Sequence, residues 1–121
     1  MSFRLLVILC LCPSALVAQP YSQSMAECAG LYQNAAQWVK TDASSGELLA
    51  LAGQWAKAAV KQAKHERIND AETTILQHID ATTVEWEEKG PSAFMSQDFR
   101  DWTSYCRSFA KHMKLKVGPD A

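Results

Sequence analysis

The sequence predicts an all-α protein, a single-domain antiparallel four-helix bundle running up-down-up-down, with one disulfide joining the first and last helices. Three observations lead to this prediction. Helix start signals recur along the chain, apolar residues recur at spacings of three, four and seven, and no proline lies between Pro20 and Pro91. An irregular helical array with the same disulfide is the alternative architecture.

The first 18 residues have the pattern of an export signal. Arg4 precedes an apolar run over residues 5–12, and Ala18 is the small residue that such signals place before the cleavage site. The run is shorter than the roughly 20 residues that a membrane helix needs. We therefore expect cleavage near Gln19 and export to the periplasm or the extracellular space. Residues 19–121 would form one helical domain without a transmembrane segment.

Export changes the meaning of the cysteines. Cys10 and Cys12 lie in the signal, which leaves Cys28 and Cys106 in an oxidising compartment where a disulfide persists. The sequence has no C-x-x-C motif, which a redox or metal role would favour. We interpret the pair as a structural disulfide, worth about 4 kcal/mol in the chain-entropy model.

The first two helices are predicted over 24–40 and 45–67. Each begins with a capping residue three positions before a glutamate, at Ser24 and at Ser44. The inward face of the first is expected to hold Cys28, Leu31, Ala35, Trp38 and Val39. That of the second is expected to hold Leu48, Leu51, Ala52, Trp55, Ala59 and Ala63.

The last two helices are predicted over 70–89 and 97–116. Asn69 begins the third capping pattern, and the fourth helix follows Ser96, with stops at Gly90 and Gly118 before prolines. Their inward faces are expected to hold Ile75, Ile79, Thr82 and Trp86, then Phe99, Trp102, Cys106, Phe109 and Met113. All four tryptophans lie on these apolar faces, so we interpret them as core residues, with a partly open pocket between helices as the alternative.

Catalytic and metal-binding patterns are missing from the sequence. His65-Glu66 begins like the zinc-protease motif, but Asn69 stands where the second histidine is needed. The other histidines, His78 and His112, lie on different helices. The acidic run of Asp80, Glu85, Glu87 and Glu88 is typical of a solvated helix face. We expect no enzymatic activity and no bound cofactor or metal.

A haem carrier is the cofactor-binding alternative, because small exported four-helix bundles can hold haem. The sequence lacks the C-x-x-C-H motif of covalent attachment. A non-covalent pair would use Met25 and His112. However, His112 is rotated by about 120° from the face that carries Met113 and Cys106, at 100° per residue.

Charge is distributed unevenly. Removing Arg4 from the 12 Lys and Arg leaves 11 against 13 Asp and Glu, a net charge of −2 that gives no general attraction to nucleic acid. Cations gather near the ends of the second and fourth helices, which an up-down bundle places side by side. We call this set the basic end: Lys57, Lys61, Lys64, Arg67, Arg107, Lys111 and Lys114. Helix dipoles favour part of this pattern.

These observations predict a small exported accessory or interaction protein without catalytic activity. Its basic end would contact an anionic partner, either a protein or an anionic membrane surface. The alternative function is a periplasmic carrier that holds haem or a small apolar molecule in the bundle core.

Overall fold

The computed structural model describes residues 19–118, and within that range the regular structure is entirely helical. The predicted export signal, 1–18, lies outside the described residues. The elements are α1 (Tyr21–Ala35), α2 (Asp42–His65), α3 (Ala71–Lys89), the short 3-10 helix η1 (Pro91–Met95) and α4 (Gln97–His112). The all-α prediction is confirmed.

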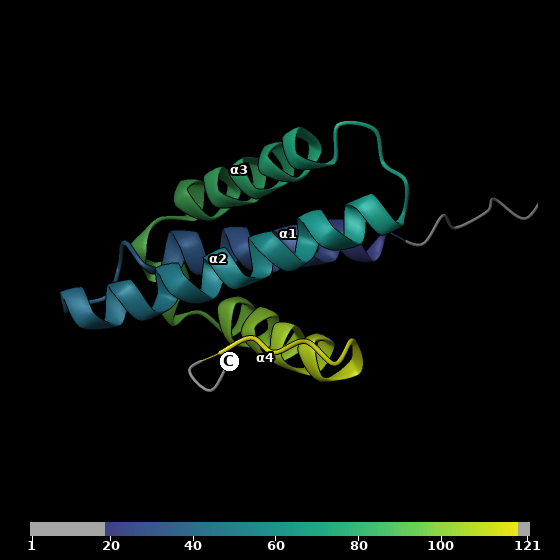
Figure 1. The fold of residues 1–121 in the computed structure, drawn as a ribbon. Helices are drawn as coiled ribbons and strands as arrows, with labels where there is room; N and C mark the ends of the chain where they lie inside the picture. The colour runs from purple at the N-terminus through teal and green to yellow at the C-terminus, as the bar shows by residue number, and fades with distance from the viewer. Residues whose placement is uncertain (1–18, 119–121) are drawn as a thin grey trace, which may run out of the picture.

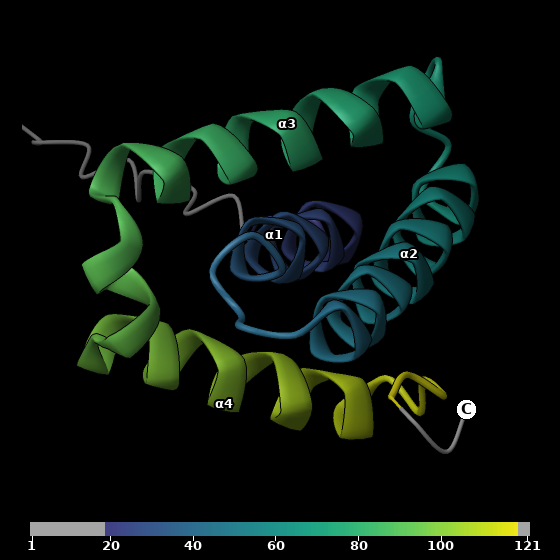
Figure 2. The same cartoon turned by 90° about the vertical axis from the view of Figure 1, so that its left-hand side faces the viewer.

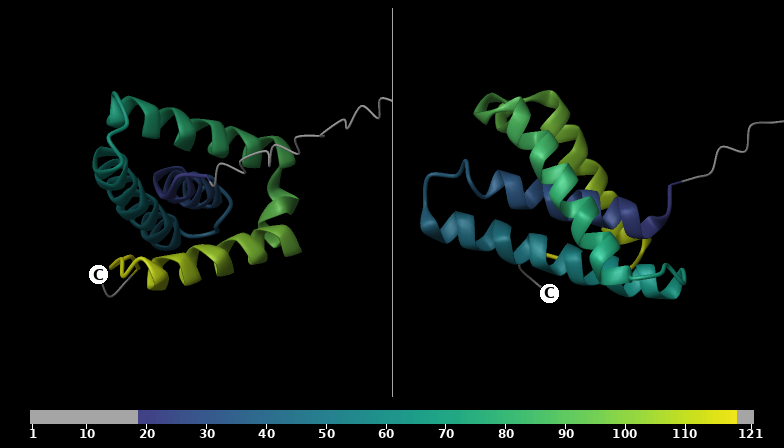
Figure 3. Two further views of the ribbon diagram at one scale, coloured as in Figure 1. Left: turned by 90° about the vertical axis from the view of Figure 1, so that its right-hand side faces the viewer. Right: turned by 90° about the horizontal axis from the view of Figure 1, so that it is seen from above.

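The helices alternate in direction along the chain. In Figure 1, α1 and α3 run one way while α2 and α4 run the other, as an up-down-up-down bundle requires. The view from above in Figure 3 shows that α3 and α4 cross α1 and α2 obliquely. The C-terminal ends of α2 and α4 therefore point to the same end of the molecule.

Helix α1 is the centre of the molecule. Figure 2 shows α2, α3 and α4 around it, with η1 closing the remaining side. Eleven of its 15 residues are buried, although the sequence predicted one inward face. The sequence does contain a signal for this, because Glu27 is the one charged side chain in the helix. Many of the others are small, which lets the neighbouring helices come close.

The closest approach is between α1 and α3 at Gly30. A Cβ atom there would lie 2.7 Å from the Cβ of Thr82 and 2.9 Å from the carbonyl oxygen of Ile79. Both distances are too short for real side chains, and the second involves backbone that cannot rotate away. Glycine at this position therefore sets the spacing of the two helices.

The predicted start signals are only partly correct. Ser24 lies inside α1, where its hydroxyl accepts a hydrogen bond from the Gln19 side chain (3.1 Å). Thr41, not Ser44, caps α2, since its Oγ1 accepts from the Ser44 amide (3.1 Å). Asp70, not Asn69, precedes α3 and makes no side-chain cap. Ser96 does cap α4 through the Phe99 amide (3.1 Å), as expected.

Three helices also end earlier than predicted. Helix α1 stops at Ala35 and not at residue 40, α2 stops at His65 and not at 67, and α4 stops at His112 and not at 116. After α4, Lys114 takes a left-handed conformation (φ 54°), and the Leu115 amide bonds back to the Ala110 carbonyl (2.9 Å). Arg67 (φ 60°) ends α2 in the same way. This turn usually contains glycine, and neither Arg67 nor Lys114 is a residue from which a helix end would be predicted.

The tryptophans divide into two pairs. Trp55 and Trp86 are buried in the core as predicted, whereas Trp38 and Trp102 are half-buried. Trp38 lies just beyond the end of α1 and donates to the Asn34 side chain (3.2 Å). The prediction that all four belong to the core is therefore wrong for the two that lie at the margins of the packed helices.

Candidate functional site

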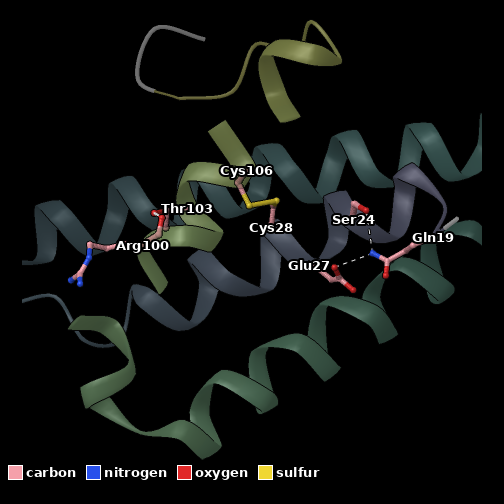
Figure 4. The surroundings of a disulfide bond; sticks show 7 residues. All are labelled: Gln19, Ser24, Glu27, Cys28, Arg100, Thr103 and Cys106. Atoms are coloured by element: carbon pink, nitrogen blue, oxygen red, sulfur yellow. Dashed lines mark hydrogen bonds between the residues drawn. A yellow bond between two sulfur atoms is a disulfide. The ribbon is translucent and has the colours of Figure 1, made fainter. Parts of the chain in front are cut away.

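The predicted disulfide is present and joins α1 to α4. Cys28 and Cys106 are both fully buried, with their Cα atoms 5.9 Å apart, an ordinary separation for this bond. Figure 4 shows the bond crossing from one helix to the other. Next to it, the side-chain amide of Gln19, just before α1 begins, donates to Ser24 and Glu27. The bond fixes the position of α4 against the central helix.

Phe109 is the second attachment of α4. Its ring stacks with Trp55 of α2 (centroids 6.1 Å apart) and contacts Tyr21 of α1 at 5.8 Å. Apart from Cys106, Phe109 and Ala110, the residues of α4 are exposed or half-buried. Helix α4 therefore touches the bundle through a short buried patch, and much of its length stands away from α2.

A groove lies where α4 stands away from α2. Its volume is about 610 Å³, within the range of small-molecule sites. Leu48, Leu51 and Trp55 line it from the α2 side, and Phe99 and Ala110 line it from α4. Leu48 and Leu51 are half-buried because they face this space. The sequence analysis placed both leucines in the core and gave a partly open pocket between helices only as the alternative interpretation of the tryptophans.

The cations of α2 in the basic end lie on its outer face, beside α3. Lys57, Lys61 and Lys64 are exposed and line a shallow depression together with Glu72 of α3. Lys64 Nζ is 3.9 Å from Glu72 Oε1, a weak exposed pair. Arg67 follows in the turn after the helix.

The cations of α4 occupy a different face. Arg107 and Lys111 are exposed and both line the groove, and Lys114 lies in the turn that ends the helix. The basic end is thus brought to one end of the molecule but divided over two faces, one on each side of α2. Of its seven cations, only Lys64 forms an ion pair with another residue within 19–118.

Glu66 connects the end of α2 to the start of α1. Its Oε2 accepts from the Ser22 amide (3.2 Å) and from the Gln62 side chain (3.0 Å), and the Ser22 hydroxyl donates to Oε1. Burial opposes ionisation, but the hydrogen bonds from Ser22 and Gln62 outweigh it and hold the pKa of Glu66 below its ordinary value. Glu66 therefore caps the amino end of α1, where Pro20 offers no side-chain cap.

The other candidate groups stay apart. In the described part of the chain, no group of three or more His, Cys, Asp or Glu residues could hold a metal ion. Met25 is buried in the core while His112 is exposed, so these two do not form a pair of haem ligands. Glu85, Glu87 and Glu88 are exposed on α3, and Glu87 accepts from Gln37 (2.9 Å).

No protein-family model matches the chain, and no curated protein or solved structure shows significant similarity to it. None of the helices within residues 19–118 is both long enough and apolar enough to cross a membrane.

Proposed function

We propose that the protein is a small exported accessory protein that acts by binding, without catalysis. The signal-like pattern of residues 1–18 supports export, and a buried disulfide of this kind persists in oxidising compartments. The intact mass of the exported protein tests this proposal. We expect a chain that begins near Gln19, and recovery of the uncleaved chain in a membrane fraction would contradict it.

We further propose that the basic end contacts an anionic lipid surface. The observation that carries this proposal is the position of three of the seven cations. A helix dipole favours cations within the last turn, yet Lys57, Lys61 and Arg107 precede the last turns of α2 and α4. The dipole therefore does not account for them. Acidic residues gather at the other end of the molecule, around the start of α2 and the end of α3.

A lipid surface suits this arrangement better than an acidic protein. The cations lie on both sides of α2 and do not converge on one concave site that a protein would fill. A broad anionic surface can contact the cations on both sides of α2 at the same time. Tyr21, half exposed at this end, is a residue type enriched where proteins meet lipid headgroups.

The test is co-sedimentation with vesicles of phosphatidylglycerol and phosphatidylcholine, compared with phosphatidylcholine alone. Each cation near a charged membrane contributes up to about 1 kcal/mol, so reversing Lys61, Lys64 and Lys111 to Glu should weaken binding on the order of 100-fold. Binding should also decrease between 0.1 M and 1 M salt, as the Debye length shrinks from about 10 Å to about 3 Å. Helicity should be unchanged, because all three side chains are exposed.

Single reversals provide a matched control. Lys61→Glu and Lys40→Glu change the net charge equally, but Lys40 is exposed in the loop before α2, at the opposite end. Only Lys61→Glu should weaken vesicle binding. Equal effects of the two substitutions, or equal binding to both kinds of vesicle, would show that the basic end is not the contact surface. Salt-sensitive capture of an acidic protein without vesicle binding would instead favour a protein partner.

A further inference from the structure

The groove between α2 and α4 is a space that side chains would fill in a packed four-helix core. The disulfide and Phe109 hold α4 at two neighbouring points, and the α4 residues that line the groove include Thr103 and Ala110, whose side chains are short. Apart from the stack of Phe109 on Trp55, the side chains of α2 and α4 therefore leave a space between the two helices. The space of about 610 Å³ between them stays lined by half-buried Leu48, Leu51 and Phe99.

The groove is apolar at one end and basic at the other. Phe94 and Phe99 pack together (centroids 5.1 Å apart) where α4 begins, and Arg107 and Lys111 lie one turn apart near its other end. The α4 wall from Phe99 to Lys111 is about 18 Å long at 1.5 Å per residue. An occupant with an extended apolar chain and a single polar head would match both ends.

The charge of the lining selects the sign of the head group. Arg107 and Lys111 line the groove, and none of its described lining residues is acidic. Tyr32 adds a neutral hydroxyl from α1. Burial raises the pKa of Tyr32, although the positive charge of Arg107 lowers it in part, so this group stays protonated and can donate a hydrogen bond. Two cations and a phenol suit a carboxylate and repel a cationic head.

The chain after α4 forms the last wall. Leu115 and Val117 line the groove as this segment passes from α4 to α2, and the Gly118 amide donates to Gln54 Oε1 (2.7 Å). Beyond Gly118 lies a second cavity of about 500 Å³, lined by α2 residues that include Leu48 and Leu51. The segment thus covers part of the groove on the solvent side, which shields part of an apolar chain from water.

We propose that this groove binds a free long-chain fatty acid, with the acyl chain along Leu48, Leu51 and Phe99 and the carboxylate at Arg107 and Lys111. This site shares Arg107 and Lys111 with the basic end, but it differs from the proposed contact with a lipid surface because it needs a single dispersed molecule and no membrane. It names the class of ligand and the residues that hold it, where the sequence offered only a partly open pocket between helices as an alternative.

The test uses a naturally fluorescent polyunsaturated fatty acid, added below its aggregation limit and without vesicles. Three competitors of equal chain length separate the contribution of the acyl chain from that of the head-group charge: palmitate is anionic, hexadecanol is neutral and hexadecyltrimethylammonium is cationic. Palmitate should displace the probe, hexadecanol should compete at least 10-fold more weakly, and the cationic competitor should be weakest. Absence of probe binding at micromolar protein, or equal competition by all three, would overturn the proposal.

Paired variants locate the site. Leu51→Trp should fill the groove and abolish probe binding, whereas Leu49→Trp, on the exposed side of α2, should bind like the unmodified protein. Arg107→Ala and Lys111→Ala should each weaken binding about 10-fold, and Lys40→Ala should have no effect. Circular dichroism verifies that each variant is folded. Unchanged probe binding in folded Leu51→Trp would place the ligand elsewhere and contradict the proposal.

The same variants separate the two proposals. Leu51→Trp should keep its affinity for anionic vesicles while losing the fatty acid, because the α2 lysines are untouched. Conversely, Lys61→Glu should lose vesicle affinity and keep the fatty acid. Failure of either proposal can therefore be recognised independently of the other.

Discussion

At the scale of single residues, Glu66 shows how a surface carboxylate can stabilise a distant helix. It lies 44 positions after Ser22 in sequence, yet it accepts the Ser22 amide at the start of α1. The sequence pattern instead assigned this cap to Ser24, because capping rules consider only neighbours along the chain. A cap supplied from another helix cannot be found from local spacing. Its signature is a lowered pKa, which makes the cap testable by pH.

We expect Glu66→Gln to destabilise the protein by about 1 kcal/mol at pH 7, the usual size of a helix-cap contribution. Because the folded-state pKa of Glu66 is lowered, the stabilisation is present above the ordinary glutamate pKa of about 4.3. It is lost as the pH falls through the folded-state value. The stability difference between the two proteins, measured by urea denaturation across pH, should therefore shrink once the pH falls below the ordinary glutamate pKa and vanish only below the lower folded-state pKa.

Glu72→Gln is the control for that experiment. Glu72 is exposed and its carboxylate meets only Lys64, at 3.9 Å, within the described residues. We expect a change of a few tenths of a kcal/mol at pH 7, as for other exposed pairs. An equal loss of stability in both variants would mean that the change in net charge, and not the cap on α1, explains the effect of Glu66→Gln.

At the scale of helices, the spacing of α1 and α3 depends on a glycine that a helix would normally disfavour. We expect Gly30→Ala to destabilise the protein by about 1 to 3 kcal/mol, because the new methyl group would overlap Thr82 and the Ile79 carbonyl. Gly53→Ala is the matched control, since nothing lies within 4 Å of a Cβ there. It should be neutral or stabilising by up to about 1 kcal/mol through helix propensity. Thermal melts of both variants decide between these outcomes, and a stabilised Gly30→Ala would contradict the close packing.

The sequence predicted the four helices, the start of α4 and the end of α3, but not where α1, α2 and α4 end. The apolar spacing within α3 and the cap at Ser96 are local properties, and both were read correctly. In contrast, the early ends of α2 and α4 depend on Arg67 and Lys114 in a left-handed conformation that glycine usually occupies. Tertiary packing imposes these conformations. Local sequence therefore carries no sign of them.

The burial of Leu48 and Leu51 was predicted wrongly for a related reason. The spacing of Leu48 and Leu51 correctly put them on the inward side of α2, but burial also needs side chains on the opposite helix. Thr103 and Ala110 of α4 are too short to reach them. One sequence shows which face of a helix is apolar, but not how far away the facing helix lies. The distance of α4 follows from where Cys106 and Phe109 attach it.

At the scale of the whole molecule, α4 depends on the disulfide more than the other helices do. Helix α1 buries most of its residues against its neighbours, whereas α4 contributes only Cys106, Phe109 and Ala110 to the buried set. Without the covalent bond, α4 would be held mainly by Phe109, which packs on Trp55 and Tyr21, and by Phe99, which packs on Trp86 of α3. The remaining helices would keep α1 packed between α2 and α3, with Gly30 against Thr82.

The double substitution of Cys28 and Cys106 by Ala should therefore destabilise α4 more than the other helices. The chain-entropy contribution of a loop spanning 78 positions is about 4 kcal/mol, a large share of the 5–15 kcal/mol that stabilises a typical domain. We expect hydrogen exchange to show α4 amides losing protection first, while the central amides of α1 stay protected. Fatty-acid binding should disappear when α4 loses its order, because α4 forms one wall of the groove.

Reduction of the disulfide in the unmodified protein should reproduce both effects, which separates loss of the bond from the effect of the alanines. Uniform loss of protection over all four helices would instead show that α4 and the central helices fold as one cooperative unit, with the disulfide stabilising all of them equally.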